Sequence, residues 1–401
     1  MSDTTELDTQ VASAARKVRI LGALSWDAEV EQAFLAHRRA GRRELPQPAP
    51  VAADASPDEA LADAIGRCDP ADPRQAFIAR TAESYRQALA MLASAHTPGF
   101  QRHGLALYGG PRDPIGLDGP TLHAEAEHLL QAGEALDLPV PEATVPSQQA
   151  RDQLQAAIDA HFDEPLPVEL DPHLGSLAAA GSQRVRLRDG IAYAPVQLEQ
   201  LLQHEALVHS ATKRNGQASG LATLGLSSPR TTRDQEGIAT LAEMVTDTLD
   251  LQRLRRIALR VRMVDHAMQG ADFLQVFEAL LEAGQPEREA FRSSMRVFRG
   301  GDVRGGIAFP KDVVYLAGLR RVHSFLMAAL RAHRDELIPV LFAGRLTCGD
   351  AVAMAPLWAE GTLAAPTVVP PWARHVDRLA AYLVWAAFGQ GVPAMPLKAF
   401  D

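Results

Sequence analysis

His204-Glu205-Ala206-Leu207-Val208-His209, with Gln235-Glu236-Gly237-Ile238-Ala239 further along the chain, is the most informative part of this sequence. It supplies two imidazoles, a carboxylate beside the first of them, and a second carboxylate on what is predicted to be a separate helix. In a catalytic zinc site of this type two histidines and one glutamate bind the metal, and water takes the fourth position. His204, His209 and Glu236 are therefore candidate ligands of Zn²⁺, and Glu205 is the free carboxylate beside them.

The spacing of the two histidines is unusual. In the common zincin helix the histidines of an HExxH motif lie one turn apart on the same face. Here the second histidine follows at i+5, about 140° around a regular helix of ~3.6 residues per turn. Either this is no metal site, or the helix widens locally into a π-type turn, which occurs inside helices mostly at functional sites. Both interpretations stay open on the spacing alone.

The residues around the first motif predict a strand, a turn and a helix. Residues 183–188 alternate apolar and basic side chains, as a half-exposed strand does. Asp189-Gly190 is typical of a hairpin turn, and residues 191–194 can return as the partner strand. Apolar residues at helical spacing then run over 198–211, and Asn215-Gly216 is the expected C-terminal cap of that helix.

A second helix is predicted to begin near Thr232, with Glu236 in its first turn. An acidic side chain there is favoured by the helix dipole alone, by roughly 0.3–1 kcal/mol. The dipole does not explain Gly237, because glycine inside a helix costs roughly 0.5–1 kcal/mol relative to alanine. Close approach of another backbone would explain it. Glu243 lies on the same face as Glu236 and is the expected partner of a ligand imidazole.

Several motifs, taken together, resemble one known family. HEALVHSATKRNGQ, DQEGIATLAE, RVFRGG and FPKDVVYLAGL occur in the order found in the bacterial flavohemoglobin-expression-modulating QEGLA-motif proteins, with Ile238 in place of the leucine. Those proteins are similar to the microtubule-associated tyrosine carboxypeptidases, which use an HExxxH helix and a later glutamate as zinc ligands and act on tubulin tails. The resemblance implies that His204, His209 and Glu236 bind zinc and that Glu205 is the catalytic carboxylate.

Composition and charge favour a cytoplasmic enzyme. With 401 residues, of which 47% are hydrophobic, the chain can bury a sizeable core. Its two cysteines, Cys68 and Cys348, fit a reducing cytosol. The apolar runs are shorter than a membrane span or a signal peptide requires, and a net charge of −9 disfavours nucleic-acid binding. We expect no membrane and no nucleic-acid partner, and the oligomeric state is unknown.

Basic residues gather after the metal motifs. Residues 292–321 hold seven lysines and arginines against two aspartates. Arg299 and Arg304 each precede a pair of glycines, which would let backbone and guanidinium close on a carboxylate. Arg299, then Lys311, and Arg304 are the candidates for binding a substrate carboxylate, although a solvated helix face explains other members of this segment equally well.

Helical patterns dominate the chain. They lie near 73–95, 119–136, 147–162, 272–283, 286–298, 312–335 and 372–388. Strand patterns are fewer, at 104–108, 183–188, 191–194 and 307–309. The predicted fold class is therefore α+β: a mostly helical, zincin-like metallopeptidase with a small antiparallel sheet beside the HExxxH helix.

Three regions are predicted along the chain. Residues 1–58 form an N-terminal helix and a Pro/Ala-rich linker, residues 59–165 a helical region, and residues 166–401 the zincin-like catalytic region. We expect the helical region to pack on the catalytic region rather than to fold independently.

The predicted activity is hydrolysis by a zinc-activated water, with Glu205 as general base. The substrate is expected to be the C-terminus of a peptide or protein, as for a carboxypeptidase. An oxyanion needs a donor besides the metal, for which Tyr315 is the first candidate; Tyr193, also a candidate for binding substrate, is the second. Two alternatives remain: a zinc hydrolase of a non-peptide amide or ester, and a non-catalytic regulatory zinc protein.

Overall fold

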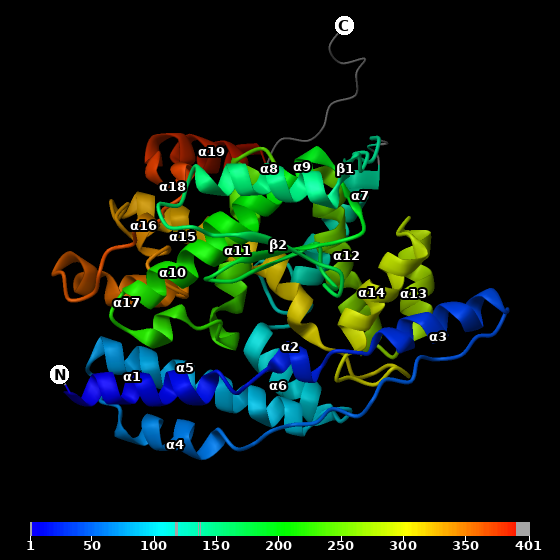
Figure 1. Cartoon of the computed structure of the whole chain (residues 1–401), viewed down its shortest axis with the longest axis horizontal. Coiled ribbons are helices and arrows are strands. Elements are labelled where there is room, and N and C mark those ends of the chain that lie inside the picture. Colours follow the sequence, from blue (N-terminus) through cyan, green and yellow to red (C-terminus); the bar gives the residue numbers. More distant parts are fainter. Residues whose placement is uncertain (1, 117–118, 135, 137, 390–401) are drawn as a thin grey trace, which may run out of the picture.

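The helices formed by the first 108 residues build one end of the molecule (Figure 1). A computed structural model describes residues 2–116, 119–134, 136 and 138–389. Its first helices are α1 (Ser2–Ala15), α2 (Ile20–Ala23), α3 (Ala28–Arg39), α4 (Asp58–Arg67), α5 (Pro73–Ala93), α6 (Pro98–Tyr108) and α7 (Leu122–Glu134). A segment without helix or strand connects α3 to α4, where the Pro/Ala-rich linker is predicted.

Two small sheets lie beside the helix that carries the histidines. The elements here are β1 (Val145–Pro146), α8 (Ser147–Asp159), β2 (Val168–Asp171), β3 (Ala178–Ala180), β4 (Val185–Arg188) and β5 (Ala192–Tyr193). The central strand β4 pairs in parallel with β2 and antiparallel with β3, and β1 pairs antiparallel with β5. The predicted antiparallel sheet is therefore a mixed three-stranded sheet with a separate two-stranded ribbon.

The predicted hairpin between residues 183–188 and 191–194 is wrong, although its turn is present. Gly190 has φ +71°, the left-handed conformation that a tight turn requires. The Asp189 carboxylate accepts a hydrogen bond from Ser147 Oγ (2.6 Å), and this contact directs the chain towards α8. β5 pairs with β1 instead of β4, and its partner residues come from 46 to 48 positions earlier in the chain.

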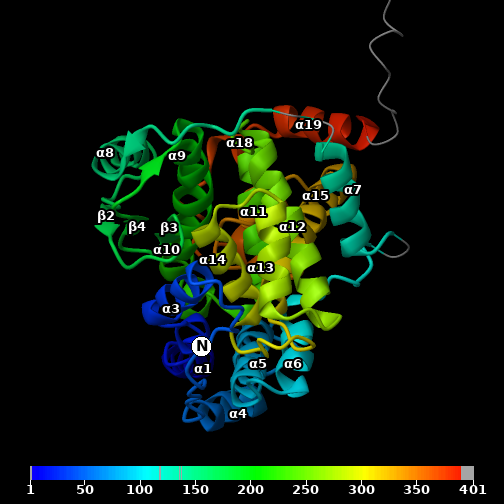
Figure 2. The ribbon, with the colours of Figure 1, turned by 90° about the vertical axis from the view of Figure 1, so that its right-hand side faces the viewer.

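Helices from the second half of the chain build the centre and the opposite end of the molecule (Figures 1 and 2). They are α9 (Pro195–Leu201), η1 (Leu202–Ser210), α10 (Ala211–Ala218), η2 (Ala222–Gly225), η3 (Pro229–Thr231), α11 (Thr232–Val245), α12 (Leu251–Met268), α13 (Phe273–Glu282), α14 (Glu287–Phe298), η4 (Pro310–Val313), α15 (Val314–Arg331), α16 (Leu337–Val340), α17 (Cys348–Ala359), α18 (Pro371–Arg374) and α19 (Val376–Gly389). α11, α12 and α15 run through the middle in both views, and α18 and α19 lie opposite the N-terminal helices.

Most predicted helices are confirmed with shifted ends, but two predicted strands are wrong. Residues 104–108 belong to α6, which begins after Thr97, whose Oγ1 accepts from Gly99 N (3.2 Å), with Pro98 in the first turn. Residues 307–309 form no strand. Of the predicted helix 119–136, residue 135 lies outside the described residues, as do residues 390–401 of the predicted catalytic region.

The buried cores cross the predicted boundary at residue 165. One cluster joins Leu7 of α1 and Phe77 of α5 to Ile238 and Leu241 of α11. A second joins α3 and α6 to α12, α13 and α14, and a third packs α8 on the sheet and on η1. The N-terminal helices thus share apolar contacts with the helix that carries Glu236.

One helical stretch of the described chain, Pro310–Arg331, is long and apolar enough to cross a membrane. Half of its most apolar window is buried inside the protein, where α15 packs along α11. A core helix passes the same test of length and composition, so this stretch is weak evidence for a membrane span.

Candidate metal centre

The helix that carries the two histidines widens in the middle. α9, η1 and α10 follow one another without a break, and η1 is a π-helix over Leu202–Ser210. The wider turn moves His209 onto the face of His204, so that the two ring centroids lie 4.8 Å apart with their planes at 88°. The predicted π-type turn is confirmed. The predicted cap at Asn215-Gly216 is wrong, because α10 continues to Ala218 and the left-handed residue is Gly220 (φ +97°).

A π-turn disturbs the regular backbone hydrogen bonds, and buried carbonyls then need other partners. The His209 carbonyl accepts from Arg345 Nη2 (2.9 Å). Thr212 Oγ1 lies 2.7 Å from the Val208 carbonyl and 2.9 Å from Gln235 Oε1, which ties the wide turn to α11 beside Glu236. Arg345 was not anticipated, because a single arginine more than 100 residues after the motif carries no local pattern.

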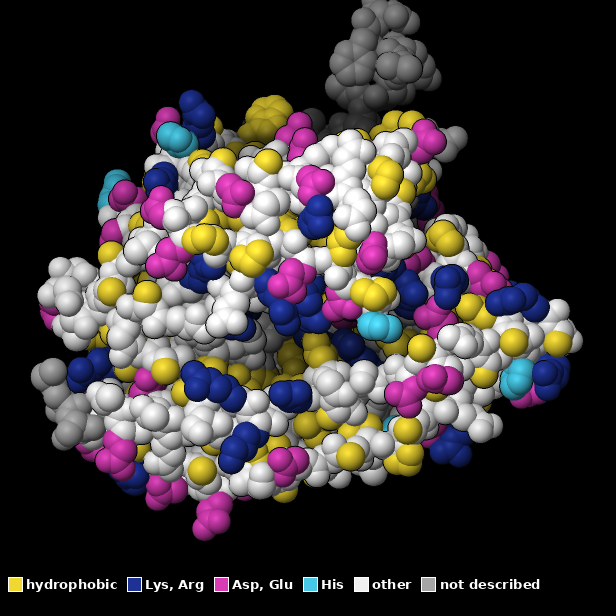
Figure 3. All heavy atoms as spheres, viewed as in Figure 1, with side chains coloured by type: hydrophobic (Ala, Val, Ile, Leu, Met, Phe, Trp, Pro, Cys, Tyr) yellow, Lys and Arg dark blue, Asp and Glu magenta, His cyan; other side chains and the backbone are white. Residues whose placement is uncertain are grey.

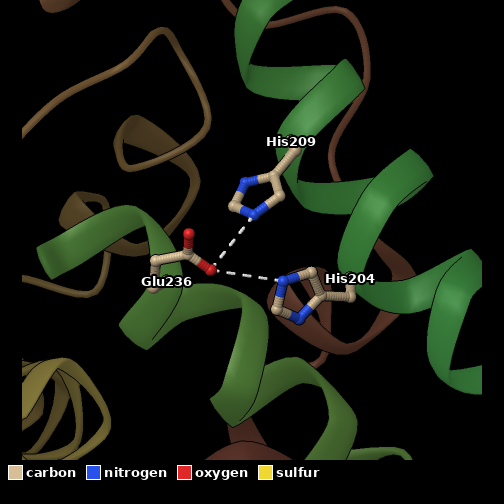
Figure 4. A group of neighbouring side chains, drawn as sticks. All are labelled: His204, His209 and Glu236. Atoms are coloured by element: carbon tan, nitrogen blue, oxygen red, sulfur yellow. Dashed lines mark ion pairs between the residues drawn. The ribbon is translucent and has the colours of Figure 1, made fainter. Parts of the chain in front are cut away.

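Both imidazoles face Glu236 on α11 (Figure 4). Glu236 Oε2 lies 3.4 Å from His204 Nε2 and 3.5 Å from His209 Nε2, and one ligand atom from each of the three residues lies within 4.8 Å of the others. Ligands bound tetrahedrally at about 2.0–2.1 Å from a zinc ion lie about 3.3 Å apart. Glu236 Oε2 is buried and has no hydrogen-bond partner among the described residues. The position of this oxygen between the two imidazoles and its lack of a hydrogen bond therefore fit a bound metal cation.

Close contact between α11 and α15 places Glu236. A Cβ atom on Gly237 would lie 2.4 Å from the Gly318 carbonyl carbon, and one on Gly318 would lie 2.1 Å from the Arg233 oxygen. Only hydrogen fits at either position. The close backbone approach predicted from Gly237 is confirmed, and its partner is α15 rather than the histidine helix.

Glu243 orients His204. His204 Nδ1 lies 2.7 Å from Glu243 Oε1, and since a carboxylate only accepts, Nδ1 carries the proton and Nε2 faces Glu236. Arg253 holds the same carboxylate through Nε (3.1 Å) and Nη2 (3.0 Å). The predicted imidazole–carboxylate contact is present, and such contacts set the tautomer and orientation of metal-binding histidines.

Glu205 points to the sheet instead of the triad. Its Oε2 accepts a hydrogen bond from the backbone N–H of Ala180 (3.1 Å) on β3, which is an edge strand. The side chain is half-buried. The edge of the sheet therefore holds one oxygen of Glu205 beside the metal-binding helix.

A family model for the microtubule-associated tyrosine carboxypeptidases matches residues 32–391. The chain belongs to this family. Its members are metallo-carboxypeptidases, so the buried group of His204, His209 and Glu236 is the candidate metal site of a metallopeptidase. The resemblance found in the sequence motifs is confirmed. A comparison with curated proteins found no match.

Electrostatics of the site keep Glu236 charged. Burial alone would raise the pKa of its carboxyl group, but Lys311 and the two imidazoles lower it well below its usual range. Burial lowers the pKa of His209, which favours the neutral imidazole that binds metal. Burial acts in the same direction on His204, but Glu236 and Glu243 outweigh it and raise the pKa of His204. Metal binding would therefore displace a proton from His204.

A cluster of cations lies next to the triad. Lys311 Nζ lies 3.6 Å from Glu236 Oε1 and 5.8 Å from the centre of the Tyr315 ring. Arg253 and Arg260 also lie over this ring, at 5.6 and 4.9 Å. Tyr315 is the predicted donor for the oxyanion. Its ring lies beside Lys311, and Lys311 in turn contacts Glu236, a candidate metal ligand.

The other residues predicted to bind substrate differ in their surroundings. Arg299 is buried over the Phe309 ring (5.4 Å) and forms no ion pair within the described residues. Arg304 is exposed and pairs with Asp302 (2.7 Å), as expected of an arginine in a surface loop. Tyr193 is fully buried, with its hydroxyl 2.8 Å from the Arg188 carbonyl and 3.0 Å from that of Leu177. Its polar group is occupied by the turn, so the structure favours a packing role for Tyr193.

Proposed function

We propose that this protein is a zinc-dependent carboxypeptidase that removes the C-terminal residue of a peptide or protein. The observation that supports this most directly is the convergence of His204, His209 and Glu236, in which Glu236 Oε2 lies 3.4 and 3.5 Å from the two imidazoles, close to the separation of tetrahedral zinc ligands. Two neutral imidazoles and one carboxylate are the donor set of many zinc peptidases. The family name points to tyrosine as the first C-terminal residue to test.

Zinc bound by these three residues would polarise the scissile carbonyl and lower the pKa of a bound water. Glu205 would take the proton of that water and pass it to the leaving amine. Its carboxylate is held by Ala180 N through one oxygen, so it has a fixed direction. Tyr315 would donate to the oxygen of the tetrahedral intermediate.

Recognition of the terminal carboxylate is assigned to the buried cations. Lys311 already pairs with Glu236, whereas Arg299 forms no ion pair with a described residue. Burial and Arg296 lower the pKa of Arg299, and Asp312 opposes this only in part, so an added carboxylate would relieve an unfavourable buried charge. Arg299 is therefore a better candidate than Lys311 for binding the terminal carboxylate. Arg304 is no longer a candidate, because it is exposed and forms an ion pair with Asp302.

Face-on, the molecule shows a hollow between the N-terminal helices and the sheet region, with lysine and arginine side chains along its rim (Figure 3). A cationic rim favours the approach of an anionic substrate. Two unpaired cysteines, one half-buried and one buried, suit the cytoplasmic location that we propose.

Paired peptides test the proposal. A peptide ending in tyrosine with a free carboxylate should lose that tyrosine, and its C-terminal amide should be cut about 10²-fold more slowly, because a charge-assisted bidentate contact is lost. Arg299→Ala should remove this discrimination, whereas Arg304→Ala, which also precedes two glycines, should retain it. Mass spectrometry of the products gives the readout. Equal cleavage of both peptides would instead support an endopeptidase or another amidase.

A further inference from the structure

A cavity of about 450 Å³ opens between α15, α17 and the segment that follows α6. This volume lies within the ~300–1,000 Å³ typical of sites for small molecules. Apolar side chains form much of its wall, among them Val313, Ala317, Phe325 and Val352. None of the three candidate metal ligands lines it.

Three arginines line this cavity, and two of them have acidic partners. Arg320 Nε lies 3.4 Å from Glu125, and Arg321 Nε lies 2.8 Å from Asp234. Arg233 is half-buried, and its guanidinium makes no hydrogen bond or ion pair with any other residue that the structure describes. A half-buried guanidinium without a partner favours an anion brought by a ligand.

Gly109 lies next to Arg233 in the lining. Its φ of +81° favours glycine, and a Cβ atom there would lie 3.0 Å from Asp113 Oδ2 and 3.7 Å, an ordinary contact, from Arg233 Nη1. Asp113, the acidic residue of the lining, accepts a hydrogen bond from Gly110 N (2.8 Å) and forms no ion pair with Arg233. The lining thus holds three cations and one anion, of which Arg233 is the cation left free.

The cavity shares two structural elements with the metal centre. Arg233 stands one turn before Glu236 on α11, and Val313 follows Lys311 by two residues in η4. Arg233 and Val313 line the cavity, whereas Glu236 and Lys311 face each other at the triad. A ligand in the cavity would therefore contact the elements that position two residues of the metal centre.

We propose that this cavity binds a small organic carboxylate with an apolar body, distinct from any substrate at the metal centre. The carboxylate pairs with Arg233, and the apolar part packs on Val313, Phe325 and Val352. The proposal does not depend on the peptidase activity.

Calorimetry with 4-phenylbutyrate and its uncharged analogue 4-phenylbutanamide tests the site on the metal-loaded protein. We expect the acid to bind at least about tenfold more tightly than the amide, since a charge-assisted pair is worth roughly 1.4 kcal/mol or more. Arg233→Gln should abolish this preference, and Ala317→Leu should weaken both compounds by filling the cavity. Arg304→Gln, an exposed and paired arginine, is the matched control.

A carboxylate can also bind zinc, so a second variant separates the two sites. His209→Ala should remove the metal and leave the binding of 4-phenylbutyrate unchanged. The proposal is overturned if binding disappears with His209→Ala and persists in Arg233→Gln. It is also overturned if acid and amide bind equally, or if neither binds at millimolar concentration. Circular dichroism of each variant confirms that the fold is retained.

Discussion

His204 and Glu205 are neighbours in the chain, yet their side chains serve different parts of the site. Successive side chains on a helix point in different directions, so His204 faces Glu236 while Glu205 reaches the N–H of Ala180 on β3. One short motif therefore supplies both a candidate ligand and a candidate base. The same geometry allows the two roles to be tested separately.

Changing Glu205 to glutamine should stop hydrolysis without releasing the metal. The amide cannot take a proton, and general acid–base help is typically worth 10²–10⁴-fold. We expect kcat for a tyrosine-ended peptide to fall by that factor while elemental analysis still finds about one zinc per chain. His204→Ala is the comparison, since it should lose both zinc and activity. A rate close to that of the wild type in Glu205→Gln would remove Glu205 from the mechanism.

The Glu243 carboxylate should set the affinity for the metal. It is buried, accepts from His204 and is held by Arg253 at two points. Glu243→Gln keeps the shape but removes the charge, and changes to such partners typically weaken metal binding 10–100-fold. Competition with a chelator measures this. Glu199→Gln, an exposed glutamate on α9, is the control, and equal affinity in the two variants would contradict the assigned role.

At the scale of elements, the site depends on one wide turn and one close helix pair. The π-turn brings His209 to His204, and the contact of Gly237 with Gly318 brings Glu236 to both. α11 supplies no histidine, so its position relative to η1 must come from packing. The spacing of α11 and α15 is thus a condition for the triad.

Gly237→Ala should disrupt this helix pair. The added methyl would lie 2.4 Å from the Gly318 carbonyl carbon, and forced overpacking of a core costs about 1–3 kcal/mol. We expect a lower midpoint of thermal unfolding and loss of zinc. Gly66→Ala in α4 is the control, since no atom lies within 4 Å of its Cβ position and alanine favours a helix by roughly 0.5–1 kcal/mol. Similar stability of the two variants would show that α11 can move away from α15.

At the scale of the whole molecule, the N-terminal helices support the metal centre from a distance. Leu7 of α1 is fully buried in the cluster that contains Ile238 and Leu241 of α11. The Asp8 carboxylate accepts from Ala222 N (2.5 Å) and Thr223 N (2.9 Å), which joins α1 to the segment after α10. The N-terminal helices and the metal-binding helices therefore share apolar and polar contacts.

Leu7→Ala should therefore destabilise the catalytic region although it lies about 200 residues away in sequence. Truncation of a buried leucine costs about 2–5 kcal/mol. Chemical denaturation should show one transition, whether it is followed by a signal from the metal centre or by circular dichroism. The free energy of unfolding should fall by this amount. Leu21→Ala, at a position 45% exposed, should change little. If Leu7→Ala melts the N-terminal helices alone and leaves the metal centre intact, the two parts are independent.

The sequence by itself predicted the three candidate metal ligands, the π-turn that their convergence requires, the mostly helical class and the close approach at Gly237. Each of these follows from local spacing or from the conformational cost of a single residue. Only the tertiary structure decided the strand partners of β4 and β5, the contact of Arg345 with the π-turn, and the different surroundings of Arg299 and Arg304. Those features depend on which distant segments meet, and burial, rather than local propensity, selects the partners.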